Sequence, residues 1–406
     1  MKPTILTFAH YYLPGNLAGG PIRSIANMVD LLSDEFVFYI ITAGHDYGAS
    51  KPYHEIKLDK WHRVGKAHVF YASDAMLLLP RLARLIRETD HDFLYLNSFF
   101  DPAFTIQPLI ARRLGLIPIK PLIIAPRGEF SEGAFVLKYK KKALYIWISK
   151  RFGLYSDVFW HASTPLEKID IEQVFKKKYI ASKPTIFIAR DLLEQPNIKY
   201  QPYITPKLST SLPPTKPLQL CFLSRISPMK NLDYALRVLA DVKVVVCFSI
   251  YGPLENKAYW LKCQLLIAKL PKNIQVVYKG SVNHEQVVET LARHDLFFLP
   301  SLGENFGHAI HEALRAGIPV LLSDQTPWLN LEQKGVGWSL PLNAPSGFVQ
   351  AIKHVAGWSL ETRQNVSRKV LAYAVEAGNN TQAIEQNRLL FRAALSSQYL
   401  IQRKHT

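Results

Sequence analysis

The sequence predicts an α/β fold of two domains, each built on a doubly wound, mainly parallel sheet. Three observations predict it. The chain has 406 residues, which is long for a single core, and 48% of them are hydrophobic. Short apolar strands alternate with helical segments in both halves, which is typical of βαβ units. A stretch with six prolines, residues 195–217, separates the two series and has the composition of a linker.

The first series of elements occupies the N-terminal half. Its strands are short runs rich in Ile, Phe, Val and Tyr that end at turn residues. A helix is expected over residues 21–33, because Pro21 suits a first helical turn and apolar residues recur at helical spacing. The predicted strands are residues 4–12, 36–44, 68–73, 93–98 and 121–128.

The second series follows the proline-rich stretch and again alternates strands with helices. The segment 308–317 is predicted as a helix, with Ile310, Ala313 and Leu314 on its apolar face and Gly317 as its stop. In such sheets ligands bind at the carboxyl ends of the strands, so the loops there are the places to search for chemistry. The predicted strands are residues 218–225, 244–252, 274–280, 295–301 and 319–324.

Composition narrows the classes of function. The net charge of +17 favours an anionic partner, such as a phosphorylated substrate, a nucleic acid or an acidic membrane, although it also serves solubility. The three cysteines lack zinc-ligand spacing, so we expect reduced thiols and no metal. No G-x-G-x-x-G, P-loop or H-E-x-x-H motif occurs, which disfavours dehydrogenases, P-loop enzymes and zinc peptidases. Residues 1–14 read as a first strand and not as a secretory signal, so we expect a cytoplasmic protein.

A loop with two cations follows the first strand of the second series. Arg225 and Lys230 lie between the end of that strand and a predicted helix. Backbone N–H groups at a helix start already favour an anion, and arginine and lysine suit phosphate oxygens. The loop therefore indicates a diphosphate site, although a solvated basic turn would have the same composition.

Two glutamates flank the start of the predicted helix 308–317. Glu304 precedes it and could simply cap the positive helix end, whereas Glu312 lies inside it. The step of eight residues from Glu304 to Glu312 corresponds to roughly 10 Å along a helix axis, too far to share a proton or a metal. They could bind separate hydroxyl groups of one extended ligand, and Gly307 would let that ligand approach the backbone. With the two cations, this pattern suits a nucleotide sugar: Glu312 for the ribose, Glu304 for the sugar.

The same residues resemble a known family. SLGENFGHAIHEALRAGIPVLLSD resembles the E-x7-E signature of retaining glycosyltransferases of family 4, which have the GT-B fold, and SRISPMKN resembles their phosphate-binding loop. TPWLNLEQKGVGWSL is similar to a segment of members that build bacterial surface polysaccharides. The looser landmarks are NLAGGPIRSIANMVDLL, APRGEFSEGAFVLKYKKKALY and WHASTPLEKIDI.

The resemblance implies two Rossmann-like domains facing each other across a cleft that closes on the donor. Residues 1–205 would bind the acceptor, 206–385 the nucleotide sugar, and a last helix, 386–406, would cross back to the first domain. It also implies transfer with retention, from a UDP- or GDP-linked sugar, with no cofactor and no required metal. The acceptor would be lipid-linked, a lipopolysaccharide or an exopolysaccharide.

The resemblance also assigns roles to individual residues. Arg225, Lys230 and Glu304 would be the catalytic residues, with the two cations stabilising the leaving diphosphate. Many relatives carry a histidine near the transferred sugar where this chain has Arg127. The expected substrate-binding residues are Glu312, Asn305, Phe306, Gly307, Gly19, Gly20 and Arg127.

One basic stretch of the sequence bears on where the protein is located in the cell. Residues 137–152 contain six cations and no acid, interleaved with Leu, Tyr, Ile, Trp and Phe. A helix of this composition can lie on an anionic membrane, here the inner face of the cytoplasmic membrane, or can be an ordinary surface helix packed through its apolar residues.

Two other classes of function compete with the enzyme. A non-catalytic GT-B scaffold could keep nucleotide affinity while assisting polysaccharide assembly. A nucleic-acid binder is suggested only by the charge, and the sequence has no recognisable nucleic-acid module.

Overall fold

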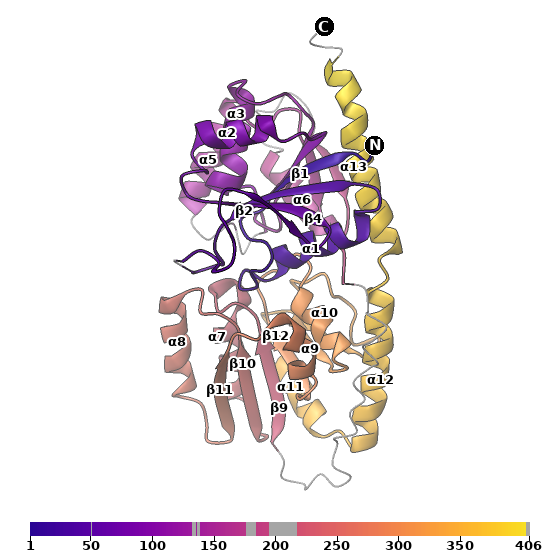
Figure 1. The fold of residues 1–406 in the computed structure, drawn as a ribbon. Coiled ribbons are helices and arrows are strands. Elements are labelled where there is room, and N and C mark those ends of the chain that lie inside the picture. Colours follow the sequence, from indigo (N-terminus) through magenta and orange to yellow (C-terminus); the bar gives the residue numbers. More distant parts are fainter. Residues whose placement is uncertain (50, 132–134, 136–138, 176–183, 195–216, 403–406) are drawn as a thin grey trace. The chain divides into compact units, whose positions relative to one another are not determined.

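The computed structural model describes residues 1–49, 51–131, 135, 139–175, 184–194 and 217–402. The chain divides into two compact units: unit 1 is Met1–Leu193 with Asn380–Thr406, and unit 2 is Glu194–Asn379. Each unit is an α/β structure built on one sheet (Figure 1). The predicted proline-rich linker, apart from its last residue, Pro217, and the predicted boundary at 205/206 lie outside the described residues.

Unit 1 contains an eight-stranded sheet in the order β3-β4-β2-β1-β5-β6-β7-β8. Neighbouring strands are parallel except β3 and β4, which form a hairpin at one edge. The strands are β1 Thr4–Phe8, β2 Val37–Ala43, β3 Trp61–Val64, β4 Ala67–Ala72, β5 Phe93–Asn97, β6 Leu122–Ala125, β7 Phe159–Ala162 and β8 Thr185–Ile188.

Helices cover both faces of this sheet, because successive strand residues point to opposite sides. Leu6 and its neighbours on one face pack with side chains from α2, α3, α5 and α6. Ile5 and its neighbours on the other face pack with side chains from α1 and α13. The helical segments are α1 Gly20–Leu32, α2 Leu79–Glu88, the π-helix η1 Pro102–Ile106, α3 Gln107–Arg113, α5 Tyr139–Arg151, α6 Pro165–Phe175 and α13 Thr381–Gln402.

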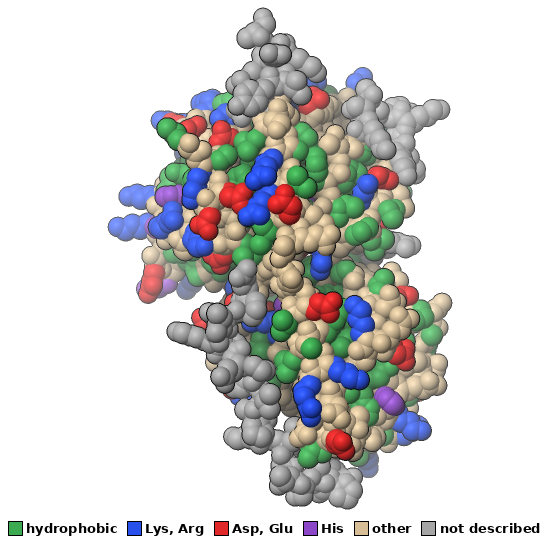
Figure 2. Space-filling model, turned by 90° about the vertical axis from the view of Figure 1, so that its right-hand side faces the viewer, with side chains coloured by type: hydrophobic (Ala, Val, Ile, Leu, Met, Phe, Trp, Pro, Cys, Tyr) green, Lys and Arg blue, Asp and Glu red, His purple; other side chains and the backbone are tan. Residues whose placement is uncertain are grey.

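The C-terminal helix α13 completes the core of unit 1. Phe391 is fully buried and its ring packs 5.3 Å from the ring of Phe36. The guanidinium of Arg388 forms an ion pair with Glu35 at 2.5 Å. Figure 2 shows the side of the molecule on which α13 lies in Figure 1, and there basic and acidic side chains are interspersed among apolar ones.

Unit 2 contains a six-stranded, all-parallel sheet in the order β11-β10-β9-β12-β13-β14. Its strands are β9 Leu218–Leu223, β10 Val246–Tyr251, β11 Ile274–Gly280, β12 Leu296–Leu299, β13 Val320–Ser323 and β14 Gly337–Leu340. Its helical segments are the 3-10 helix η2 Pro228–Lys230, α7 Leu232–Ala240, α8 Lys257–Ile267, α9 His284–Leu291, α10 His308–Arg315, α11 Pro345–Ala356 and α12 Leu360–Ala377.

The ten predicted strands are all present, most of them shorter than predicted. The largest corrections are to strand 4–12, which ends at Phe8 before a turn in which the N–H of Gly15 donates to the carbonyl of Tyr12, and to strand 121–128, which ends at Ala125. Strands β3, β7, β8 and β14 were not predicted. The described helices include none that is both long and apolar enough to cross a membrane.

Candidate functional site

The order of strands singles out one place in the sheet of unit 2. From β9 the chain continues to β10 on one side, whereas β12 lies on the other side of β9. This is a topological switch point, where the loops after adjacent strands diverge and leave a ligand crevice outside the carboxyl ends. The loop after β9 carries Arg225 and Lys230, and the loop after β12 carries Glu304.

The structure brings two of the predicted catalytic residues into direct contact. The ammonium Nζ of Lys230 lies 2.7 Å from Oε1 of Glu304, and the two side chains are only 13% and 9% exposed. The cation comes from the end of η2, and the carboxylate comes from a loop that starts 70 residues later in the chain. A phosphate placed here could replace Glu304 as the partner of Lys230, and a sugar hydroxyl could replace Lys230 as the partner of Glu304.

Hydrogen bonds tie the two loops together. The side-chain amide of Asn231 donates to the carbonyl of Pro300 at 3.0 Å, and the N–H of Leu302 donates to the carbonyl of Met229 at 2.9 Å. Asn231 holds the left-handed conformation, φ 57°, which turns the chain from η2 into α7. The positions of Lys230 and Glu304 are therefore set by backbone contacts as well as by their own attraction.

Arg225 lies in the same loop but has a different partner. Its Nη1 is 3.1 Å from Oε1 of Glu255, and its side chain is about one third exposed. Glu255 follows β10, so this pair links the loops after β9 and β10. Arg225 was predicted from the sequence, whereas the carboxylate beside it was not.

The residues after Glu304 shape the start of α10. The backbone N–H of Glu304 donates to the carbonyl of Gln325 at 3.1 Å. The ring of Phe306 is buried against Trp328, whose indole N–H donates to the Phe306 carbonyl at 2.6 Å. Gly307 has φ 81° at the helix start, a conformation that favours glycine. Asn305 lies between Glu304 and Phe306 and is half-buried in the same loop.

Glu312 lies one turn inside α10 and contacts a histidine that the sequence analysis missed. Nδ1 of His284 is 3.3 Å from Oε1 of Glu312, and Nε2 of the same ring is 3.5 Å from Oε2 of Glu194. Arg315 also contacts Glu194, at 3.1 Å. The hydrogen bond from His284, together with Arg315, lowers the pKa of Glu194 to about 2. The signal available in the sequence was a polar Asn283–His284 pair opening the helix after β11.

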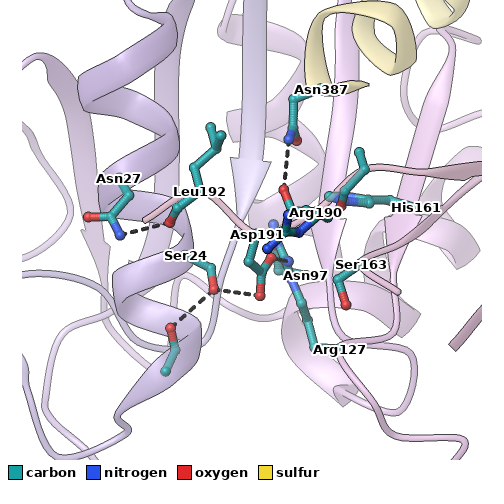
Figure 3. Close-up of polar contacts among 12 residues, drawn as sticks. Ser24, Asn27, Asn97, Arg127, His161, Ser163, Arg190, Asp191, Leu192 and Asn387 are labelled. Atoms are coloured by element: carbon teal, nitrogen blue, oxygen red, sulfur yellow. Dashed lines mark hydrogen bonds and ion pairs between the residues drawn. The ribbon is translucent and has the colours of Figure 1, made fainter. Parts of the chain in front are cut away.

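In unit 1 the predicted residue Arg127 lies in a buried polar network (Figure 3). Its Nη1 donates to Asp191, its Nη2 to the hydroxyl of Tyr95 at 2.8 Å, and its Nε to Asn97 at 3.1 Å. The side chains of Arg127 and Asp191 are 8% and 4% exposed. Burial by itself lowers the pKa of Arg127, and the neighbouring Tyr95 and Asp191 more than offset this effect.

This network also fixes the protonation of His161. Burial, reinforced by the charge of Arg127, lowers the pKa of His161 to about 4, so the ring is neutral at pH 7. Its Nε2 donates to the carbonyl of Ala189, which leaves Nδ1 to accept from the hydroxyl of Tyr95. Arg127 itself has φ 56°, a strained conformation for a non-glycine residue at the carboxyl end of β6.

The predicted glycines Gly19 and Gly20 lie at the start of α1. Gly19 has φ 73°, and a Cβ built on it would meet no heavy atom within 4 Å. The conformation therefore favours glycine here, and the space beside it is open. Among the described residues, no group of three or more His, Cys, Asp or Glu side chains is arranged to hold a metal ion.

A protein-family model matches part of the second half of the chain. Residues 206–370 match the model of the family described as glycosyl transferases group 1. That segment contains Arg225, Lys230, Glu304 and Glu312. No curated protein matches the chain.

Solved structures resemble the whole chain. Sucrose-phosphate synthase from Thermosynechococcus elongatus has a TM-score of 0.69 at 14% identity, over 98% of this chain and 100% of that one. HepE from Anabaena, in complex with UDP-glucose, has a TM-score of 0.63 at 16% identity, over 97% and 99%. A glycosyltransferase from Rickettsia africae has a TM-score of 0.60 at 15% identity, over 97% and 99%. These similarities establish the fold, which is GT-B.

Proposed function

We propose that this protein is a retaining glycosyltransferase that moves a sugar from a UDP- or GDP-linked donor to a polysaccharide precursor. The observation that carries the proposal is the Lys230–Glu304 pair at the switch point of unit 2. It lies inside the segment that matches the group 1 glycosyl transferases. Similarity to HepE, a protein solved with UDP-glucose, supports a UDP-linked donor.

The residues of the site suit the charges that develop in such a reaction. As the bond between the anomeric carbon and the phosphate oxygen breaks, the leaving nucleoside diphosphate gains negative charge. Lys230 and Arg225 are fixed cations that would stabilise this charge without a metal ion. The acceptor oxygen forms the new bond to the anomeric carbon, on the face that the phosphate leaves, and its proton passes to the leaving phosphate.

The carboxylates would hold the two ends of the donor. Glu304 would release Lys230 to the phosphate and accept hydrogen bonds from the transferred sugar, which fixes the anomeric carbon in place. Glu312 would accept hydrogen bonds from the ribose, with His284 holding its other oxygen. Asn305 and Gly307 would line the donor through the loop before α10, and Gly19, Gly20 and Arg127 would belong to the acceptor-binding domain.

The first test is calorimetric binding of UDP, GDP, ADP and dTDP to the wild-type protein. We expect one of these nucleotides to bind, and Arg225→Ala/Lys230→Ala to abolish that binding because the diphosphate loses its cations. Lys243→Ala removes an exposed lysine of the same unit and is the matched control. If the nucleotide bound the double variant as well as the wild type, the site assignment would be wrong.

Turnover separates the enzyme from a non-catalytic scaffold. With the nucleotide known, Glu304→Ala is expected to reduce transfer strongly while affinity for the free nucleoside diphosphate stays close to wild type, because Glu304 serves the sugar. A protein that binds the nucleotide but turns over no sugar linked to it would instead be a scaffold.

The helix α5 supports a location at a membrane. Leu144 and Trp147 are 58% and 63% exposed, and Ile148 lies beside them on the same helical face. Lys140, Lys141 and other cations surround them, while the predicted residues 137 and 138 lie outside the described part of the chain. Exposed apolar side chains within a basic helix suit the anionic inner face of the cytoplasmic membrane, where lipid-linked acceptors would be met.

Vesicle sedimentation tests this location. The wild-type protein is expected to sediment with vesicles that contain phosphatidylglycerol and not with pure phosphatidylcholine vesicles. Leu144→Ser/Trp147→Ser should lose most of the binding, since two large apolar side chains no longer enter the interface. Leu261→Ser/Leu265→Ser, on the exposed side of α8, is the control. Equal sedimentation of both variants with anionic vesicles would overturn the assignment to α5.

A further inference from the structure

Unit 1 has a switch point of its own, at the carboxyl ends of β1 and β5. From β1 the chain continues to β2 on one side, whereas β5 lies on the other side of β1. His10 follows β1 and Asp101 follows β5. Their side chains meet: Nδ1 of His10 is 2.6 Å from Oδ2 of Asp101. Neither residue was singled out by the sequence analysis.

The contacts of Asp101 fix the tautomer of this histidine. Oδ1 of Asp101 accepts hydrogen bonds from the backbone N–H groups of Ala103 and Phe104, at 3.0 and 2.8 Å. An ionised carboxylate is only an acceptor, so Nδ1 of His10 carries the hydrogen that it shares with Oδ2. In the neutral ring Nε2 is then a lone-pair acceptor. The Asp101 side chain is 10% exposed and that of His10 is 41% exposed, so the carboxylate is enclosed while the ring remains accessible.

Two aromatic rings lie against His10, and a third lies behind one of them. The ring of Tyr11 lies 4.3 Å from it and the ring of Phe104 lies 5.0 Å from it. Tyr47, in the loop after β2, packs edge-on against Tyr11 at 5.6 Å. Tyr11 and Tyr47 are partly exposed. A polar acceptor beside exposed aromatic faces is the usual composition of a small-ligand site.

The loops that carry these side chains are held in place. Asp46 accepts hydrogen bonds from the backbone of Asn16 at 2.9 Å and of Tyr47 at 2.7 Å, which joins the loops after β1 and β2. The partly buried carboxylate of Glu129 accepts hydrogen bonds from the hydroxyl of Ser98 and from the backbone N–H of Phe99. Ser98 has φ 151°, a strained conformation that such contacts maintain and that is typical of functional sites.

We propose that His10, Asp101 and Tyr11 form the binding site for a sugar hydroxyl of the acceptor. Nε2 of His10 accepts the hydrogen of that hydroxyl, Asp101 holds the imidazole in the required tautomer, and Tyr11 and Tyr47 contact the apolar face of the sugar ring. The ligand class is therefore a neutral hydroxylated ring, that is, a glycoside. In part this rests on the proposed function, because only a glycosyltransferase makes such a ligand an acceptor.

The histidine here binds and orients; no covalent step is assigned to it. The hydrogen bond to Nε2 engages a hydroxyl other than the reacting one, so it orients the acceptor while the proton of the reacting hydroxyl remains available to the leaving phosphate. Asp101 acts through His10 and is a positioning residue. A purely structural pair would instead leave glycoside binding unchanged when Asp101 loses its charge.

The test uses the full-length protein labelled with ¹⁵N in its histidine side chains. The probes are the p-nitrophenyl glycosides of glucose, galactose, mannose and N-acetylglucosamine. In the wild type we expect the His10 signals, assigned by their loss in His10→Gln, to show hydrogen on Nδ1 and to shift on addition of at least one glycoside. Asp101→Asn is expected to change the tautomer and to weaken glycoside binding by at least about tenfold.

Controls separate the possible outcomes. His54→Gln, an exposed histidine of the same unit, should leave glycoside binding unchanged. Nucleotide affinity, measured by calorimetry, should be the same in His10→Gln and in the wild type. If no glycoside moved the His10 signals, or if His10→Gln and Asp101→Asn bound the best glycoside as the wild type does, the acceptor site would be refuted. If the wild type bound a glycoside but none of the nucleotides, the proposed function would be refuted, whereas the glycoside site would still be supported.

Discussion

The two units place an acid–base pair at the same point of the same kind of sheet, but the pairs differ in chemistry. In unit 2 Lys230 meets Glu304 at 2.7 Å, and in unit 1 His10 meets Asp101 at 2.6 Å. Each pair joins the loops after two adjacent strands at a switch point. The cation of unit 2 is a lysine, whose side chain only donates hydrogen bonds, whereas the histidine of unit 1 has a second ring nitrogen that can accept one.

The burial and the neighbouring side chains of the two pairs also differ. The pair of unit 2 lies in the loops that also carry Arg225 and is largely buried, which suits a charged diphosphate. The ring of His10 is accessible and has aromatic neighbours, which suits an uncharged ligand. Under the two proposals, the fold fixes where each ligand binds, while the residues at the ends of two strands decide which class of ligand it is.

The largest expected effect concerns the buried pair beside the switch point of unit 1. Arg127→Met leaves the Asp191 carboxylate buried without its cation, and we expect a loss of about 3–5 kcal/mol in the free energy of unfolding. Urea denaturation measures it. Arg81→Met removes an exposed arginine of the same unit and should change stability little. Recovery in Arg127→Met/Asp191→Leu would attribute the loss to the unpaired charge, and an unchanged midpoint in the single variant would contradict the prediction.

The next effect tests the charge at the switch point of unit 2. Lys230→Ala is expected to lower kcat roughly 10²–10³-fold, because the leaving diphosphate loses a fixed cation. Steady-state kinetics with the donor found by calorimetry measures this.

A second substitution at the same position sharpens the comparison. Lys230→His gives unit 2 the type of pair that unit 1 has. At pH 8 an ordinary imidazole is neutral, so activity should stay well below that of the wild type. Full activity of this variant at pH 8 would contradict the prediction, because an imidazole would then serve at position 230 as well as the lysine does.

A smaller effect is expected at Glu312. Glu312→Gln keeps the shape of the side chain and removes its charge, so a charge-assisted hydrogen bond to the ribose is weakened. We expect nucleoside diphosphate affinity to fall about tenfold, or roughly 1.4 kcal/mol. Glu285→Gln, in the exposed first turn of α9, is the control. Affinity that is equal in both variants would remove Glu312 from the nucleotide site.

The smallest effect is the pH dependence that Glu194 confers on unit 2. The pKa of this carboxyl is about 2 in the folded protein, below its ordinary value, so its contribution to stability is complete above about pH 5 and is lost as the pH falls toward 2. Because the side chain is half exposed, the contribution should be under about 1 kcal/mol. Thermal unfolding of the wild type and Glu194→Gln should differ at pH 7, and the difference should shrink below about pH 5 and disappear as the pH approaches 2. A difference that grew on acidification would contradict this sign.

The sequence was enough to predict the fold class and every strand of the sheet interiors except β7. Buried parallel strands need continuous apolar runs, as in residues 296–299 and 320–323, and such runs are visible without coordinates. The strands β3, β8 and β14 escaped prediction because they lie at sheet edges and bury fewer side chains, so their apolar signal is weak. The inner strand β7 was noticed only as a family landmark.

For the candidate site, the sequence by itself determined which residue types stand in the loops: the cations 225 and 230, the acids 304 and 312, and the glycines. Only the tertiary structure decided their partners. Lys230 meets Glu304, Glu312 meets His284, and His10 meets Asp101 because strand order brings together segments that are 28 to 91 residues apart. Strand order depends on how the whole sheet buries its two faces, and no local pattern of residues encodes it.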